Sequence, residues 1–177
     1  TGSFSVGTPL FRSERNGEDY DKENFTYSAT EQSSPEGGSG LFLENRNAFR
    51  TPIALFENYN DQYSKDIINY IAKEDLKANE TITVHSENGN HPDVGGGYPF
   101  EYTLKQDVAA GDTIEVYDII SSTFLVAVEG KVVMTREALK INKKVDWWTI
   151  ANIAGIPSAL TISSDGDLAY VGTVSGK

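Results

Sequence analysis

The chain has no cysteine and few basic residues, and each shortage excludes some classes of site or partner. Without cysteine there are no disulfides, no thiolate metal ligands and no cysteine nucleophile. Only 15 Lys and Arg residues stand against 26 Asp and Glu residues, which gives a formal net charge of −11 over 177 residues. Because an acidic surface repels phosphate backbones and anionic lipids, we expect no nucleic-acid partner.

Long hydrophobic runs are missing as well. No stretch approaches the roughly 20 apolar residues of a membrane-spanning helix, so we expect no membrane insertion. The chain begins at Thr1 without a basic segment and an apolar core behind it. This start fits a mature protein after signal removal, although a trimmed chain would look the same. We expect an extracellular or cell-surface location.

One segment is present twice, at a spacing of 32 residues. Residues 70–84, YIAKEDLKANETITV, return as residues 102–116, YTLKQDVAAGDTIEV, with seven of 15 positions identical. Each copy predicts a strand, a polar turn and a second strand, and therefore a duplicated β-hairpin. In both copies Thr-Ile-x-Val alternates, so its Ile and Val side chains are expected to face the core. The alternative interpretation makes the two turns equivalent ligand loops.

The turns of the two copies carry residues suited to tight backbone conformations. Asn79 and Gly111 occupy equivalent positions where a positive φ is tolerated. Asp75 and Asp107 are also equivalent, and we expect each carboxylate to accept a backbone N–H in its turn.

The rest of the chain alternates short apolar runs with turn formers. Strands are predicted at residues 4–10, 25–27, 41–43, 53–56, 66–73, 100–104, 124–128, 132–134, 147–153, 160–162 and 168–174. Tyr63, Ile67, Tyr70 and Ile71 also fit one face of a helix, but the repeat favours a strand at residues 66–73. Helix formers between Thr135 and Lys144 predict a short surface helix.

Together these elements predict an all-β fold: an antiparallel β-sandwich of immunoglobulin-like or jelly-roll type with at most one or two short helices. The length admits one domain or two small sandwiches in tandem. We expect a single domain over residues 12–177, preceded by an N-terminal strand or arm at residues 1–11.

Candidate metal ligands lie in two loops. His85, His91 and Asp93 could hold a transition metal if the loop brought them together, although ordinary loop polarity is the favoured interpretation. Asp19, Asp21 and Glu23 offer alternating carboxylates for a weak calcium site, against a solvated acidic loop. The acidic turn Asp165-Gly166-Asp167 is similar. We expect no obligate cofactor.

Aromatic residues supply the other candidates. Trp147 and Trp148 are adjacent, with Tyr98 and Tyr102 as companions, and exposed aromatic rings can bind sugars or a second subunit. Adjacent side chains on a strand point to opposite faces, so one tryptophan is expected in the core. Asn24 and Asn79 begin glycosylation sequons.

No catalytic fingerprint is present. The chain has no Gly-x-Ser-x-Gly, His-Glu-x-x-His, P-loop or dinucleotide-binding motif. We therefore expect a protein that is not an enzyme, although the scattered carboxylates of a glycosidase would not be visible in one sequence.

The N-terminal segment Thr1-Gly-Ser-Phe-Ser-Val-Gly-Thr8 resembles the mature start of camelysin-like and TasA-like secreted fibre subunits, in which a Phe-x-x-Gly-Thr segment opens a β-sandwich. The match is confined to this segment, and Pro9-Leu10 replaces the Asp-Leu that commonly follows. The resemblance implies a subunit whose strand Phe4–Leu10, with Phe4, Val6 and Leu10 as its apolar residues, completes the sheet of a neighbour in an extracellular filament.

The sequence therefore favours a structural, non-enzymatic protein that associates with further copies of itself. A strand rich in Gly and Ser at a chain end can add to the sheet edge of another chain. A carbohydrate-binding or adhesin module, with glycans as partners, is the first alternative. A virion coat or decoration protein is the second.

Overall fold

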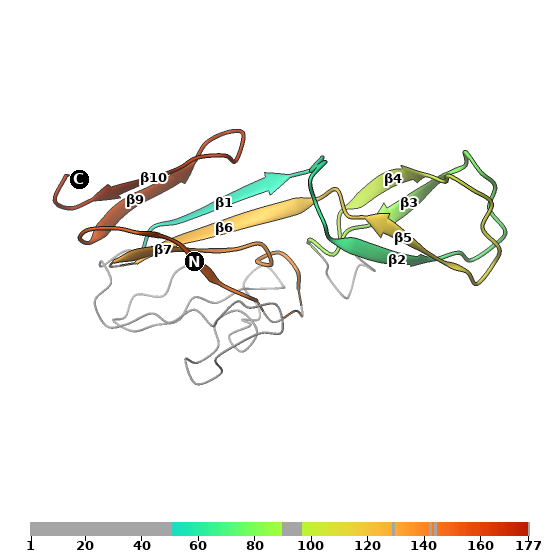
Figure 1. Ribbon diagram of the computed structural model, residues 1–177, viewed down its shortest axis with the longest axis horizontal. Helices are drawn as coiled ribbons and strands as arrows, with labels where there is room; N and C mark the ends of the chain where they lie inside the picture. The colour runs from blue at the N-terminus through green and yellow to red at the C-terminus, as the bar shows by residue number, and fades with distance from the viewer. Residues whose placement is uncertain (1–50, 90–96, 129, 142, 144, 177) are drawn as a thin grey trace. The chain divides into compact units, whose positions relative to one another are not determined.

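The computed structural model describes residues 51–89, 97–128, 130–141, 143 and 145–176, and these ranges contain strands and turns but no helix. The strands are β1 (Ile53–Asn58), β2 (Ile67–Ile71), β3 (Thr81–His85), β4 (Pro99–Thr103), β5 (Thr113–Tyr117), β6 (Ser121–Val128), β7 (Lys131–Thr135), β8 (Trp148–Asn152), β9 (Pro157–Ile162) and β10 (Ala169–Thr173) (Figure 1). The predicted all-β, sandwich-like class is confirmed. The strands predicted before residue 51 lie outside the described residues.

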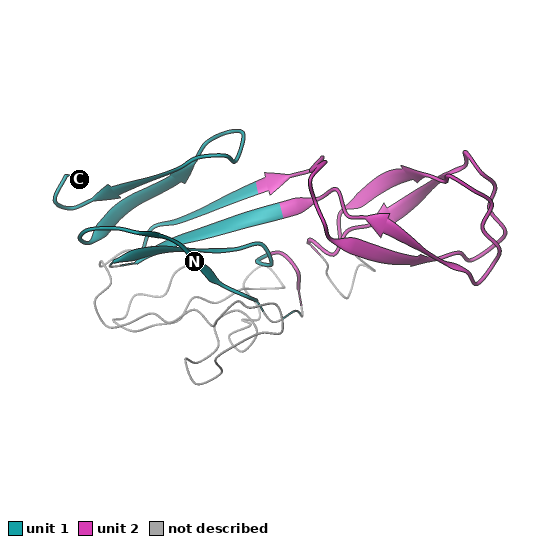
Figure 2. Ribbon diagram, viewed as in Figure 1, with its two compact units in different colours: residues 1–56, 122–138, 142–177 teal, residues 57–121, 139–141 magenta. Residues whose placement is uncertain are grey.

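The chain divides into two compact units, coloured separately in Figure 2. Unit 1 comprises residues 1–56, 122–138 and 142–177, and unit 2 comprises residues 57–121 and 139–141. The expected boundary at residue 11 lies outside the described part. The single domain over residues 12–177 stays a prediction, because two compact units can still unfold as one cooperative structure.

Unit 1 contains a four-stranded sheet in the order β1-β6-β7-β8. The strands predicted at residues 124–128 and 132–134 are confirmed as parts of β6 and β7, which pair as a hairpin with Phe124 opposite Thr135 and Val128 opposite Lys131. Strands β9 and β10 form a separate antiparallel pair in the same unit. Among the described residues of unit 1, one buried hydrophobic cluster contains Val126, Val128, Val133, Ala138, Val145 and Trp147.

Unit 2 contains two two-stranded sheets, and their pairing shows that the predicted hairpins are wrong. The strands within one copy of the repeat do not pair with each other. Instead β2 of the first copy pairs with β5 of the second, and β3 pairs with β4. The physical reason lies in the connections, which carry the core residues Leu76 and Val108. These two residues form a bridge to each other, so each connection passes from one sheet to the other instead of making a tight turn.

The core of unit 2 is built from equivalent residues of the two copies. Its buried and partly buried side chains form six pairs, each separated by 32 positions: Ile68/Phe100, Tyr70/Tyr102, Ala72/Leu104, Leu76/Val108, Ile82/Ile114 and Val84/Val116. The alternation of exposed and buried residues along β3 agrees with the predicted Thr-Ile-x-Val pattern. The duplication therefore supplies both halves of one hydrophobic core.

The turn residues have the predicted backbone conformation, but the two aspartates do not bind the backbone of their own turns. Asn79 has φ 68° and Gly111 has φ 89°, which confirms the predicted left-handed positions. The aspartates reach across to the other copy: Asp107 Oδ1 accepts the N–H of Ala78 at 2.9 Å. Asp75 Oδ1 likewise accepts the N–H of Ala110 at 2.8 Å. The two aspartates therefore tie the copies together.

The short helix predicted between Thr135 and Lys144 is not formed in the described part of that segment, which consists of the end of β7 and turns. Thr135 Oγ1 accepts the N–H of Glu137 at 3.1 Å, which closes a local turn. Glu137 and Lys140 are both buried, at 5% and 4% exposure. Tertiary contacts of these charged side chains override the helix propensity of the segment.

Candidate interaction surfaces

The outer face of the β2·β5 sheet exposes three large apolar side chains. Ile67, Ile71 and Tyr117 are 44%, 61% and 64% exposed. Ile67 lies directly opposite Tyr117 in the antiparallel register, and Ile71 follows on the same face. Asn69 and Glu115 complete the centre of this surface, which we call the β2·β5 outer face.

The duplication provides an internal comparison for this surface. The equivalent face of the β3·β4 sheet has Pro99, Thr103 and His85 where the β2·β5 outer face has its three apolar side chains. The inward-facing positions are apolar in both copies, whereas these outward-facing positions differ. Core packing does not require Ile67, Ile71 or Tyr117. Their exposure together therefore favours an interaction surface on this face.

A second exposed group of aromatic residues lies before β2 and β4. Tyr59 and Tyr98, 54% and 38% exposed, meet edge to face with ring centroids 5.4 Å apart. Tyr59 donates a hydrogen bond to Glu57 Oε1 at 3.1 Å. Desolvation and the Glu57 hydrogen bond raise the pKa of Tyr59 to about 12.

The aromatic residues singled out in the sequence do not form one cluster within either unit. Trp147 is 2% exposed and packs edge to face on Phe124, with centroids 6.0 Å apart, so it belongs to the core of unit 1. Trp148, in β8, is half-buried. Tyr102 contributes to the core of unit 2. Among these four, Tyr98 is the exposed aromatic residue.

The predicted metal ligands are placed only in part. His85 is exposed at the end of β3, and its Nδ1 lies 3.0 Å from the carbonyl oxygen of Gly97. His91, Asp93, Asp19, Asp21 and Glu23 lie outside the described residues. Within the described ranges, no three His, Asp or Glu side chains gather closely enough to hold a metal ion. The metal sites therefore stay predictions.

The acidic turn between β9 and β10 is held by its own side chains. Asp165 Oδ1 accepts hydrogen bonds from Ser163 Oγ and, at 3.2 Å, from the N–H of Asp167. The Ser163 hydrogen bond, followed by that of Asp167, lowers the pKa of Asp165. These contacts give this carboxylate a structural role.

Of the sequons, Asn24 lies outside the described part and Asn79 is exposed in its turn. No helix that could cross a membrane occurs among the residues that the structure describes.

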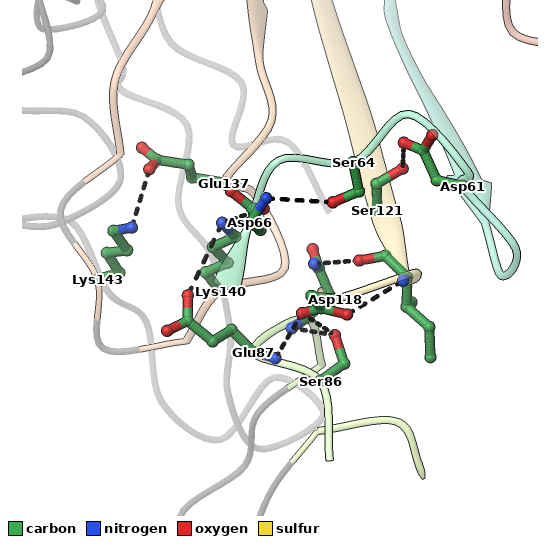
Figure 3. A network of polar contacts seen from close by, with 12 residues as sticks. Asp61, Ser64, Asp66, Ser86, Glu87, Asp118, Ser121, Glu137, Lys140 and Lys143 are labelled. Carbon is green, nitrogen blue, oxygen red and sulfur yellow. Dashed lines mark hydrogen bonds and ion pairs between the residues drawn. The ribbon is translucent and has the colours of Figure 1, made fainter. Parts of the chain in front are cut away.

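A buried carboxylate organises the polar interior of unit 2 (Figure 3). Asp118 is fully buried, and its Oδ2 accepts hydrogen bonds from Ser86 Oγ at 2.7 Å and from the N–H of Glu87 at 3.0 Å. Its Oδ1 accepts the N–H of Ile120 at 3.0 Å. Three donors thus satisfy the two buried carboxyl oxygens of Asp118. Ser86 and Asp118 are themselves equivalent residues of the two copies, 32 positions apart.

Lys140 lies beside this network. Its Nζ is 2.6 Å from Asp66 Oδ2 and 3.8 Å from Glu87 Oε2 (Figure 3). The lysine side chain is only 5% exposed, whereas those of Asp66 and Glu87 are 44% and 49% exposed. The N–H of Gly89 donates to the carbonyl oxygen of Leu139 at 2.7 Å, which fixes the segment that carries Lys140.

Sequence reasoning did not single out the β2·β5 outer face or the Lys140 cluster. A comparison of the repeats at outward-facing positions would have found the first, since Ile71 aligns with Thr103 and Tyr117 with His85. The Lys140 cluster has no local signal, because its members come from distant segments. Comparison of the chain with protein families, curated proteins and solved structures finds no match.

Proposed function

We propose that the chain is a non-enzymatic structural subunit of an extracellular filament or surface assembly, in which copies of the chain associate. The observation that supports it is the β2·β5 outer face, with Ile67, Ile71 and Tyr117 exposed together on one small sheet. Burial of such side chains at an interface is favourable by roughly 25 cal/mol per Å² of apolar surface, before the costs of association.

Charge patterning agrees with the use of this surface. Copies of a chain with a net charge of −11 repel one another, so contact is least unfavourable where charged side chains are sparse. Glu115 is the single charged residue of the β2·β5 outer face. Donation of the Phe4–Leu10 strand to a neighbouring sheet remains the second element of this proposal, and it rests on the sequence alone.

The test is negative-stain electron microscopy together with size exclusion over a range of protein concentrations. We expect filaments or regular oligomers for the unmodified chain, loss of them in Ile71→Lys, and their retention in Thr103→Lys. Thr103 is the repeat equivalent of Ile71 and is also exposed, so it is a matched control. A strict monomer at every concentration contradicts the proposal, and so does an equal effect of the two substitutions. A closed shell would move the assignment toward a virion coat or decoration protein.

Glycan binding is the second candidate, because Tyr59 and Tyr98 are exposed beside amide side chains. The carbonyl oxygen of the Asn58 side chain accepts the N–H of Asn60 at 3.0 Å, which orders this loop. A glycan array compares the unmodified chain with Tyr98→Ala, and Tyr170→Ala serves as the control at another exposed tyrosine. Binding that is lost only in Tyr98→Ala would favour an adhesin module.

A further inference from the structure

Lys140 is a buried lysine whose Nζ lies near two carboxylates, unlike the lysine of an ordinary surface ion pair. Its Nζ lies 2.6 Å from Asp66 Oδ2, and a second carboxylate, that of Glu87, stands 3.8 Å away. The chain offers a comparison in Lys77 and Asp107, which are 2.8 Å apart but 76% and 61% exposed. Burial of the lysine separates these two pairs, because the Lys140 side chain is 5% exposed and that of Lys77 is 76% exposed.

Hydrogen bonds to main-chain atoms fix the three segments that carry Asp66, Glu87 and Lys140. The N–H of Asp118 donates to the carbonyl oxygen of Asp66 at 2.9 Å. The Asp118 carboxylate in turn holds the N–H of Glu87 at 3.0 Å. Leu139, next to Lys140, accepts the N–H of Gly89. Groups held in contact in this way can react with effective molarities far above those in solution.

We propose that Lys140 and Asp66 condense to an isopeptide bond, with Glu87 as the group that transfers protons. A proton first passes from Nζ to Oδ2 along their contact, which leaves a neutral amine and a carboxylic acid. The nitrogen lone pair then attacks Cγ of Asp66, and a C–N bond forms. Glu87 accepts a proton from the nitrogen and delivers it to the departing hydroxyl as one Cγ–O bond breaks.

The products are one amide and one water molecule, so the step needs no oxidant, reductant or cofactor. The bond would join residues 74 positions apart and enclose β2 to β7 in a covalent loop. Closing a loop of this length restricts the unfolded chain, as a disulfide does. The chain has no cysteine, so this amide would provide the covalent cross-link that a disulfide provides in other proteins.

The test is the intact mass of the full chain under denaturing conditions. We expect a mass lower than the sequence mass by one water, and a proteolytic fragment in which the peptides of Asp66 and Lys140 are joined. Lys140→Arg keeps the charge but removes the amine, so the loss of water should disappear. Glu87→Gln should slow the loss or abolish it.

Two further variants test whether the loss of water comes from the Lys140–Asp66 pair. Asp66→Asn should yield the same cross-linked mass as the unmodified chain, because it forms the same amide by release of ammonia. Lys77→Arg, in the exposed pair, should leave the loss of water unchanged. The Asp165-Gly166 step can also lose water by succinimide formation, but that loss would persist in Lys140→Arg.

The proposal is overturned by an unmodified chain at its full sequence mass with the two peptides recovered separately, which would leave an ion pair only. It is equally overturned by a loss of water that persists in Lys140→Arg.

Discussion

Leu76 and Val108 exchange a reciprocal pair of backbone hydrogen bonds, at 2.9 Å and 3.0 Å, although 32 residues separate them. They are equivalent residues of the two copies, so each one meets its own counterpart. Such self-pairing is possible only at an axis of approximate two-fold symmetry. The other cross-copy bonds come in matched pairs around it, such as Ala72 N–H to Asp112 O and Leu104 N–H to Glu80 O, both 2.9 Å.

The symmetry predicts equal effects of equivalent core mutations. Val84 and Val116 are both 1% exposed in the core of unit 2. Val84→Ala and Val116→Ala each remove two buried methyl groups, so each should lower the free energy of unfolding by about 2 kcal/mol. Urea denaturation measures both. A several-fold difference between the two would contradict an equivalent role for the copies.

The contact between Lys77 and Asp107 should make the stability of the fold depend on pH in the acid range. The hydrogen bond from Lys77, followed by that from the Ala78 N–H, lowers the pKa of Asp107 below its usual value. The unfolded carboxyl binds a proton more readily, so the stabilisation is present above about pH 4 and is lost as the pH falls through the lowered pKa. Asp107→Asn should therefore lower Tm slightly at neutral pH, and by less near the acid end.

Thermal unfolding of the two proteins at several pH values checks this prediction. Lys77→Gln is the control, because it removes the lysine and keeps the bond to Ala78. The difference in Tm is expected to be small, since both side chains are largely exposed. A difference that stays constant down to the lowest pH would show that protonation of Asp107 does not matter.

Gly166 should tolerate no side chain. It has φ +81°, and a Cβ there would lie 2.5 Å from Cε1 of Phe56. Gly166→Ala therefore adds a clash with the Phe56 ring to the roughly 1 kcal/mol of a left-handed alanine. Gly130→Ala is the control, because Gly130 has φ +88° and open space around it. We expect Gly166→Ala to lower Tm clearly more; equal losses would mean that the ring moves freely aside.

Deletion of residues 1–11 tests the donated strand, which lies outside the described part of the chain. Under strand donation the truncated chain should remain folded but should no longer form long assemblies, because its neighbours lose their added strand. Electron microscopy and circular dichroism report the two properties separately. Unchanged assembly after the deletion would remove the donor strand from the proposal and leave the β2·β5 outer face as the contact.

The strands were predictable from the sequence because alternation is local. Residues 66–73 and 100–104 were predicted as strands and overlap β2 and β4. The partners of these strands were not predictable, because Ile71 and Thr113 meet only when both copies have folded. A repeat shows that two segments are alike but not whether each pairs within itself.

The β2·β5 outer face, the buried tryptophan and the Lys140 cluster were harder to predict, because their residues come together only in the folded chain. Trp147 and Trp148 were expected on opposite faces of a strand with one of them in the core, but which one is buried depends on packing against Phe124. Lys140, Asp66 and Glu87 come from three segments and carry no motif. Glu137, in a segment predicted to be helical, instead accepts the N–H of Asp146 at 2.8 Å, a contact nine residues away.

The exchange of strands between the two copies also limits how short a working version of unit 2 can be. A chain with one copy would supply one strand to each sheet and half of the core, so it could not close by itself. Two such chains, placed about the axis that runs through Leu76 and Val108, would complete both sheets. A single-copy ancestor would thus have folded as a homodimer, and tandem duplication of its gene would have joined the two halves in one chain.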